Sequence, residues 1–170
     1  ESQIIVSGWW SPPDGPASVD AVIVLERDDN GAWRTVQVLP DPVPADDNRF
    51  GSGISVHEDR LVIGDVSSNV LYVYERSGGE WVPDDVVDGE DLGLWRLGTP
   101  AFAVHGDRIV SVTSSASSDN DIGTFSVFER DRAGWTRTAA LPVAPTPVFD
   151  EDHLVVDQYQ LDFDGERVVV

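Results

Sequence analysis

A four-residue phrase occurs three times in this chain of 170 residues, and it constrains the fold more than any other feature. Each copy consists of Val, a large apolar or aromatic residue, Glu and Arg, at residues 24–27, 73–76 and 127–130. A tryptophan follows each copy, and the three tryptophans (Trp33, Trp81 and Trp135) are 48 and 54 residues apart. Regular spacing in this range indicates stacked copies of one supersecondary unit.

The middle of the chain shows the unit most clearly. Residues 54–57 alternate between apolar and polar side chains, which is the period of a half-buried strand. Residues 60–64 and 70–76 are rich in β-branched and aromatic side chains, as strands are, and a fourth strand opens at Glu80. Turn-forming residues separate these segments at 58–59, 65–69 and 77–79. The pattern predicts four short antiparallel strands joined by turns.

Similar segments extend the pattern in both directions. Residues 102–105, 108–112, 123–130 and 135–141 predict the strands of the next unit, and residues 148–156 and 161–170 each resemble a first hairpin. At the other end, residues 4–6 match residues 61–63, so the chain enters a unit at its second strand. We therefore predict a partial unit at residues 1–49, full units at 50–96 and 97–147, and a degenerate unit at 148–170.

These units predict an all-β fold. No helical period is visible, and 11 prolines would interrupt most helices. A four-stranded unit repeated at this spacing is typical of a β-propeller blade, so we predict a single propeller domain of four-stranded antiparallel blades, with about three and a half blades present. Three arrangements stay open: a sector of a larger ring, a small irregular four-bladed ring, and a ring completed by a second copy.

Residues 48–56, 59–64 and 70–76 together resemble the FG-GAP repeat, the blade motif of integrin-alpha-like propellers and of many bacterial secreted and surface proteins. The motif's Phe-Gly pair is present at Phe50-Gly51, and Leu97-Gly98 takes its place in the next unit with a slip of one residue. The resemblance covers most of residues 18–170. It implies a propeller, an extracellular or cell-surface location, and a role in adhesion. The family's Asp-x-Asp-x-Asp-Gly calcium loop has no match in this chain.

The composition narrows the range of partners. The chain has 31 acidic and 11 basic residues, and its net charge is −20. Every basic residue is arginine, and an acidic surface of this kind repels nucleic acid and anionic lipid headgroups. We expect neither as a partner, and no segment approaches the roughly 20 apolar residues of a membrane span. The composition fits a salty habitat, and it fits equally an acidic secreted proteome from a GC-rich genome. Because there is no methionine, we expect a processed product or a fragment.

Three tryptophans and one polar loop are the candidate binding residues. Trp9 and Trp10 precede a Ser-Pro-Pro segment in a predicted loop, and Trp95 also falls outside the regular spacing, so these aromatic rings could stack on a sugar or contact a protein. Calcium takes six to eight oxygen ligands. The candidate ligands for calcium are Asp119, Asn120 and Asp121. Loose Asp and Asn clusters also serve as turn formers, so the sequence predicts no cofactor, with calcium as the alternative.

Other conspicuous residues have structural interpretations. His57, His105 and His153 are evenly spaced, but only His57 and His105 occupy equivalent turns, so we interpret them as turn residues and not as a metal triad. The tryptophan that follows each phrase is interpreted as blade packing. Adjacent strand residues point to opposite faces, so the Glu and Arg of each phrase should pair across strands or between blades.

No catalytic signature accompanies these features. The chain has no nucleophile elbow and no phosphate-binding glycine motif. We therefore predict a non-enzymatic, secreted or surface-exposed propeller module that binds or scaffolds a protein or glycan. The alternative is a fragment of a propeller enzyme, a hydrolase or lyase that uses carboxylates. The blades could be completed by further sequence or by self-association.

Overall fold

A computed structural model of the chain describes residues 3–11, 18–44, 49–115, 124–142 and 161–169. Every regular element in these ranges is a β-strand, and the strands form antiparallel sheets, so the all-β prediction is confirmed. Within the same ranges no helix is long and apolar enough to cross a membrane.

Three sheets and one short hairpin contain all the described strands. The first sheet has the order β1 (Gln3–Trp10), β2 (Val19–Arg27) and β3 (Trp33–Pro40). The second sheet has the order β4 (Phe50–His57), β5 (Arg60–Asp65), β6 (Val70–Ser77) and β7 (Glu80–Asp88). The third sheet contains β8 (Leu94–Trp95), β9 (Phe102–His105), β10 (Arg108–Ser115), β11 (Thr124–Asp131) and β12 (Gly134–Pro142). The C-terminal hairpin consists of β13 (Asp162–Phe163) and β14 (Val168–Val169).

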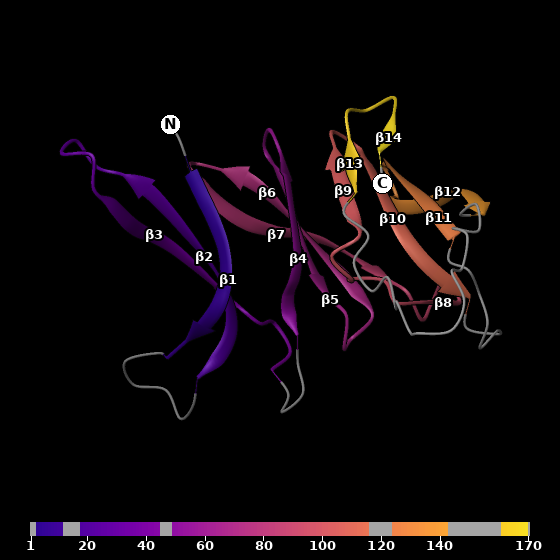
Figure 1. The fold of residues 1–170 in the computed structure, drawn as a ribbon, viewed down its shortest axis with the longest axis horizontal. Coiled ribbons are helices and arrows are strands. Elements are labelled where there is room, and N and C mark those ends of the chain that lie inside the picture. The colour runs from indigo at the N-terminus through magenta and orange to yellow at the C-terminus, as the bar shows by residue number, and fades with distance from the viewer. Residues whose placement is uncertain (1–2, 12–17, 45–48, 116–123, 143–160, 170) are drawn as a thin grey trace, which may run out of the picture.

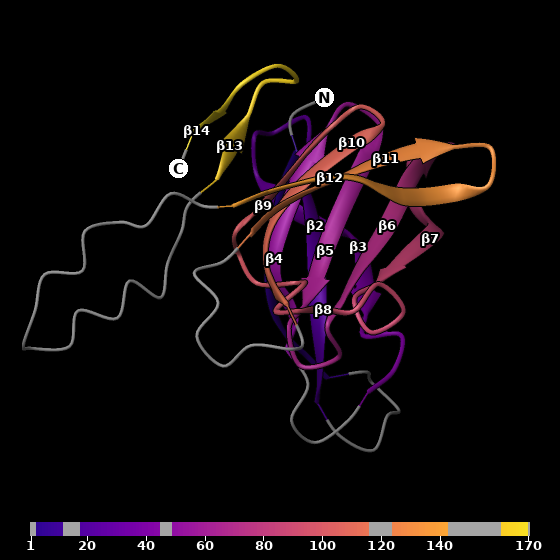
Figure 2. The same ribbon diagram turned by 90° about the vertical axis from the view of Figure 1, so that its right-hand side faces the viewer.

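The three sheets stand side by side in chain order (Figure 1). The first sheet packs on the second through the contacts of β4 with β1 and β2, and the second packs on the third through the contacts of β9 with β4 and β5. The C-terminal hairpin continues this row, because β13 packs against β9 at the edge of the third sheet (Figure 2). The second sheet therefore offers one face to the first sheet and the opposite face to the third.

The three copies of the phrase lie at the same place in the three sheets, on β2, β6 and β11. In each sheet the arginine of the phrase pairs with the tryptophan that follows it: Arg27 with Trp33, Arg76 with Trp81, and Arg130 with Trp135. A β-bulge interrupts each of these strand pairs directly after the valine of the phrase, at Val24, Val73 and Val127. Equivalent residues can therefore be identified from sheet to sheet by register.

Two apolar layers hold the sheets together. The layer between the first and second sheets contains Val22 and Val24 from β2 and Leu61 and Ile63 from β5. The layer between the second and third sheets contains the alternate residues of the second sheet, such as Val62 and Val73, together with Phe102 and Phe128. Because successive residues of a strand point to opposite faces, a strand of the middle sheet supplies both layers.

Phe50-Gly51 and Leu97-Gly98 have the same backbone role at the entrances to the second and third sheets. Phe50 and Leu97 are both buried, and the glycine that follows each has a positive φ, +84° at Gly51 and +86° at Gly98. A Cβ atom on Gly51 would contact Ser7, and one on Gly98 would contact carbonyl oxygens. Leu97-Gly98 is therefore the counterpart of Phe50-Gly51, as the sequence indicated.

Two predicted placements change. Trp9 and Trp10 were expected in a loop, but they belong to β1 and pair with Asp20 and Val19. The backbone of β2 begins far enough upstream to extend the ladder over both tryptophans, which the sequence pattern did not indicate. Strand β8 is a second difference, because Leu94 and Trp95 pair with the end of β10 although the predicted boundary places them with the preceding unit.

Candidate functional site

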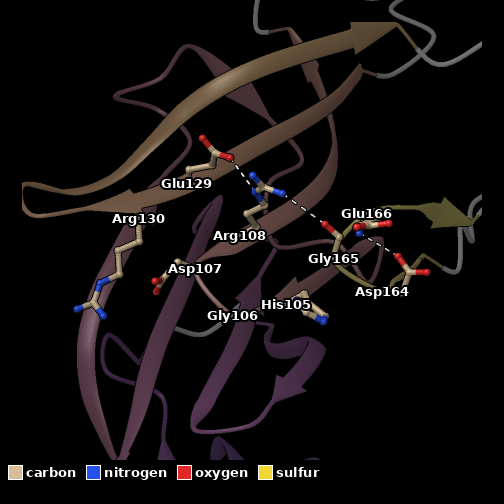
Figure 3. Close-up of a pocket in the computed structure, with 9 residues that line it drawn as sticks. All are labelled: His105, Gly106, Asp107, Arg108, Glu129, Arg130, Asp164, Gly165 and Glu166. Carbon is tan, nitrogen blue, oxygen red and sulfur yellow. Dashed lines mark hydrogen bonds and ion pairs between the residues drawn. The ribbon is translucent and has the colours of Figure 1, made fainter.

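A cleft opens between the third sheet and the C-terminal hairpin (Figure 3). It is a wide, open depression of about 610 Å³. Its lining combines one histidine, four acids, two arginines and two glycines: His105, Gly106, Asp107, Arg108, Glu129, Arg130, Asp164, Gly165 and Glu166.

Two tight turns and the end of one strand position these residues. Gly106 and Asp107 form the turn between β9 and β10, and Glu129 and Arg130 lie near the end of β11. The turn of the C-terminal hairpin supplies the opposite wall. Gly165 in that turn has a φ of +93°, and a Cβ atom there would contact the ring of His105 at 2.8 Å, so a glycine allows the hairpin to approach the sheet.

Arg108 connects the two walls of the cleft. Its Nε donates to Glu129 Oε1 at 2.7 Å, and its Nη1 lies 3.4 Å from the carbonyl oxygen of Gly165 (Figure 3). Arg130 instead reaches back to the second sheet, where its Nη2 lies 2.7 Å from Asp84 Oδ1. These contacts confirm that the Glu and Arg of the phrase pair across strands and between sheets.

Asp164 is held as a carboxylate. The backbone N–H groups of Glu166 and Arg167 donate to its Oδ1 at 2.9 and 2.7 Å. These hydrogen bonds, that from Glu166 first, stabilise the charged form and lower the pKa of Asp164 below its ordinary value. Asp164 is therefore a poor proton donor at neutral pH. Its hydrogen bonds to the backbone of its own turn give it a structural role.

An aromatic column runs beside the cleft. The rings of His57 and His105 stack with centroids 3.8 Å apart, and Phe163 meets His105 edge-on at 5.9 Å. The backbone N–H of Gly106 donates to His57 Nδ1 at 3.2 Å, which fixes the ring of His57 against the next turn. Sheet stacking brings these two equivalent turn histidines into contact. His153 lies outside the described residues.

The tryptophans predicted to bind a ligand lie at the end of the stack opposite the cleft. Trp9 is 83% exposed near the end of β1, and Trp95 is 61% exposed where β8 meets the end of β10, whereas Trp10 is partly buried. Trp9 and Trp95 lie on the first and third sheets, so a whole sheet separates them. The structure places them at one end of the molecule but not in one pocket.

The predicted calcium ligands Asp119, Asn120 and Asp121 lie outside the described residues. An earlier acidic loop is described, and there Asp28 acts as a turn former. Its Oδ1 accepts hydrogen bonds from the backbone N–H groups of Asn30 and Ala32, and its Oδ2 lies 2.6 Å from Arg34 Nη2. Among the residues that the structure describes, no three His, Cys, Asp or Glu side chains form a group that could hold a metal ion.

Sequence reasoning did not find the cleft. The signal available to it was the acidic turn before an arginine, which appears at Asp107-Arg108 and again at Glu166-Arg167. Four carboxylates and two guanidinium groups make the cleft suited to a cationic side chain or a polar group. No known family model, curated protein or solved structure is detectably similar to this chain.

Proposed function

We propose that the three sheets are consecutive blades of a β-propeller and that the chain is a non-enzymatic module that binds or scaffolds a protein or glycan. The shared register, the bulge at the same position and the side-by-side stacking support the blade assignment. The FG-GAP resemblance of residues 48–76 supports the same assignment and favours a secreted or cell-surface location.

The exposure of Trp9 is the observation that carries the binding role. Its side chain is among the largest apolar groups in the chain and is 83% exposed, whereas Trp81 in the sheet core is almost fully buried. An exposed ring on a rigid strand can stack on a sugar or enter a pocket of a protein at little entropic cost. Trp95 provides a second ring at the same end, two sheet spacings of about 10 Å away.

This separation favours an extended ligand. A polysaccharide, or an elongated protein surface, can contact both rings at once, whereas a small ligand reaches one. Two weak contacts on one ligand give an affinity greater than either alone. We therefore expect length-dependent binding, in which longer oligosaccharides bind more tightly than short ones of the same composition.

Binding to a panel of soluble polysaccharides tests the proposal, with affinity electrophoresis as the measurement and tryptophan fluorescence as the second readout. Trp9→Ala and Trp95→Ala should each weaken retardation in the gel, and the double variant should abolish it. Trp33→Ala, at an exposed tryptophan on the side of the first sheet, is the matched control and should bind normally. Unchanged retardation in the double variant would contradict this site, and release of reducing sugars would favour the enzymatic alternative.

A further inference from the structure

We propose that this chain associates head to tail with a second copy, the outer face of the first sheet of one copy packing on the outer face of the third sheet of the other. The outer face of the first sheet is the side away from the second sheet, and the outer face of the third sheet is the side away from the second. Only the expected closure of the assembly into a ring rests on the proposed propeller.

The outer face of the first sheet is apolar and uncovered among the described residues. Ile4 and Val6 are each 40% exposed. By register Ile4 corresponds to Leu61 in the second sheet and Val6 to Ile63, and both of these are completely buried because the first sheet covers them. The face has the composition of an interior surface, and its exposure follows from its position at the end of the row.

The exposure of two equivalent tryptophans differs in the same way between the first and second sheets. Trp81 is 2% exposed, and its backbone N–H and carbonyl are bonded by the side-chain amide of Gln37 from the first sheet. Trp33 holds the equivalent position in the first sheet and is 38% exposed. A further sheet against this face would bury Trp33 as the first sheet buries Trp81.

The outer face of the third sheet also exposes apolar side chains. Leu141 is 58% exposed, whereas its equivalent in the second sheet, Val87, is 3% exposed under the third sheet. Val127 is partly exposed, and its equivalent Val73 is buried. The part of this face on β11 and β12 is therefore of the same kind that the first and second sheets present to their following neighbours. Its inner part is already covered, because Val110 and Val112 of β10 are buried and Leu161 packs beside Val112.

These two faces fit one another by continuity with the interfaces already present. In both internal interfaces, the face that contains the equivalents of Val73 meets the face that contains the equivalents of Leu61. One face of each kind is left at the two ends of the described row. Contact between a first and a third sheet would repeat the internal interface a third time, whereas contact between two like faces would not.

Charge supports the same docking. In the first sheet Glu26 accepts a hydrogen bond from Gln3 of the neighbouring strand and also lies 3.6 Å from Arg76 of the second sheet. In the third sheet the equivalent Glu129 accepts from the neighbouring Arg108, and no arginine of a following sheet reaches it within the described ranges. Arg27 of the first sheet is the equivalent of Arg76. Glu129, the equivalent of Glu26, lines the cleft of Figure 3.

Arg27 is the cation that would complete this cleft. It lies over the ring of Trp33 at 5.4 Å, and the described part of the chain gives it no acidic partner. Docked on a second copy, Arg27 would meet Glu129 as Arg76 meets Glu26 within one chain. Glu129 in the cleft is then the position that Arg27 of the partner copy reaches.

The strands at the axis require one rearrangement. β1 and β14 are equivalent, because each is the second strand of a unit, and β14 pairs with the innermost strand β13. β1 has no strand on its inner edge among the described residues. In the assembly β1 of the incoming copy takes the place of β14 beside β13, which restores a four-stranded sheet from two chains.

A head-to-tail interface either closes into a ring or grows into a filament. Two copies contribute six sheets, which lies within the range of about four to eight blades of known propellers, so we expect closure at two copies. The mass would be 37.0 kDa, two chains of 18.5 kDa. Repulsion between two chains of net charge −20 opposes the contact, so salt should promote it.

Sedimentation velocity from micromolar to near-millimolar chain, at low and at about 1 M NaCl, tests the proposal. Ile4→Arg blocks the outer face of the first sheet and Leu141→Arg that of the third, and both replace exposed side chains, so folding should persist. Each alone should lower the association constant at least tenfold (~1.4 kcal/mol). Val86→Arg, at an exposed apolar residue of the middle sheet, is the matched control and should associate normally.

Mixing the two blocked variants decides the geometry. Each retains the face that the other has lost, so an equimolar mixture should form a heterodimer at concentrations where neither variant associates alone. Self-association of either blocked variant as strong as that of the unmodified chain would show contact between like faces and overturn the proposal. A mass of 18.5 kDa for the unmodified chain under all conditions would also overturn it. Neither result depends on polysaccharide binding at Trp9, so the two proposals can fail separately.

Discussion

Gly64 marks the point where two consecutive sheets approach most closely. It lies on β5, and a Cβ atom at this position would overlap the carbonyl group of Gly98, at the entrance to the third sheet. The hydroxyl of Ser52 lies 3.0 Å from the carbonyl oxygen of Gly64 and 2.5 Å from that of Gly98, so it joins the same two segments. The absence of a side chain at residue 64 therefore sets the spacing between sheets.

Gly64→Ala should lower the free energy of unfolding by about 1–3 kcal/mol, because backbone atoms cannot move aside as a flexible side chain can. Chemical denaturation with tryptophan fluorescence measures the change. Gly8→Ala is the matched control, since a Cβ atom at Gly8 of β1 would have no atom within 4 Å, and it should leave stability unchanged or slightly raised. Equal stability of the two variants would contradict the close approach.

Tyr74 gives the fold a defined response to alkaline pH. It lies in the apolar layer between the first and second sheets, and burial there, followed by the charges of Tyr72 and Asp41, raises its pKa from 10.0 to about 12. The folded state therefore holds the proton more tightly than the unfolded state. Its contribution is complete below pH 10 and is lost as the pH rises from 10 to about 12.

We expect the free energy of unfolding to fall by roughly 2–3 kcal/mol between pH 9 and pH 12, at about 1.4 kcal/mol per unit of pKa shift. The chain has no lysine, so few other groups titrate in this window. Urea titrations at stepped pH values measure the slope, and Tyr74→Phe should flatten it. A slope that survives in Tyr74→Phe would assign the effect to Tyr72, whose pKa is also raised by burial.

At the scale of elements, the sequence predicted what alternation and turn chemistry encode. Strand β9 begins and ends where the pattern placed it, β4 ends at His57 as expected, and the Ser77-Gly78-Gly79 turn lies at the end of β6 as expected. Strand β8 and the last residues of β1 were missed, since two paired residues leave no periodic trace. The cleft was missed for a similar reason: Arg108 and Gly165 are 57 residues apart, and only the stacking of the hairpin on the sheet brings them together.

Strand β14 is the element that competes with the proposed assembly. Its pairing with β13 joins Asp162 to Val169 and Phe163 to Val168. Val168→Pro disfavours this pairing, because proline fixes φ and is poorly accommodated within a paired strand, and it should release the position that β1 of a second copy takes. We expect the association constant to rise by roughly fivefold, equivalent to about 1 kcal/mol.

Sedimentation equilibrium measures this change, and Val168→Ala, which keeps the backbone N–H, should leave association unaltered. A weaker association in Val168→Pro would mean that β14 supports the contact, and the incoming β1 would then have to pair elsewhere.

At the scale of the whole molecule, charge opposes compaction. The 31 acidic residues face 11 arginines, several of which are already committed to contacts between sheets, such as Arg76 with Glu26 and Arg130 with Asp84. Among the described residues Asp41 and Asp65 are buried, and most other acids lie on a surface with few cations to offset them. Their mutual repulsion raises the free energy of the folded chain more than that of the expanded one.

Sodium chloride should therefore stabilise the fold, since the Debye length shortens from about 10 Å at 0.1 M to about 3 Å at 1 M. We expect the melting temperature at neutral pH to rise by several degrees, roughly the shift that 1–2 kcal/mol produces in a domain of this size. Differential scanning calorimetry at concentrations below association measures it. Near the isoelectric point of about 4.1 the net charge vanishes, so the same salt step should have little effect there. An equal rise at both pH values would point to general salt effects on apolar burial and away from screening of the acidic surface.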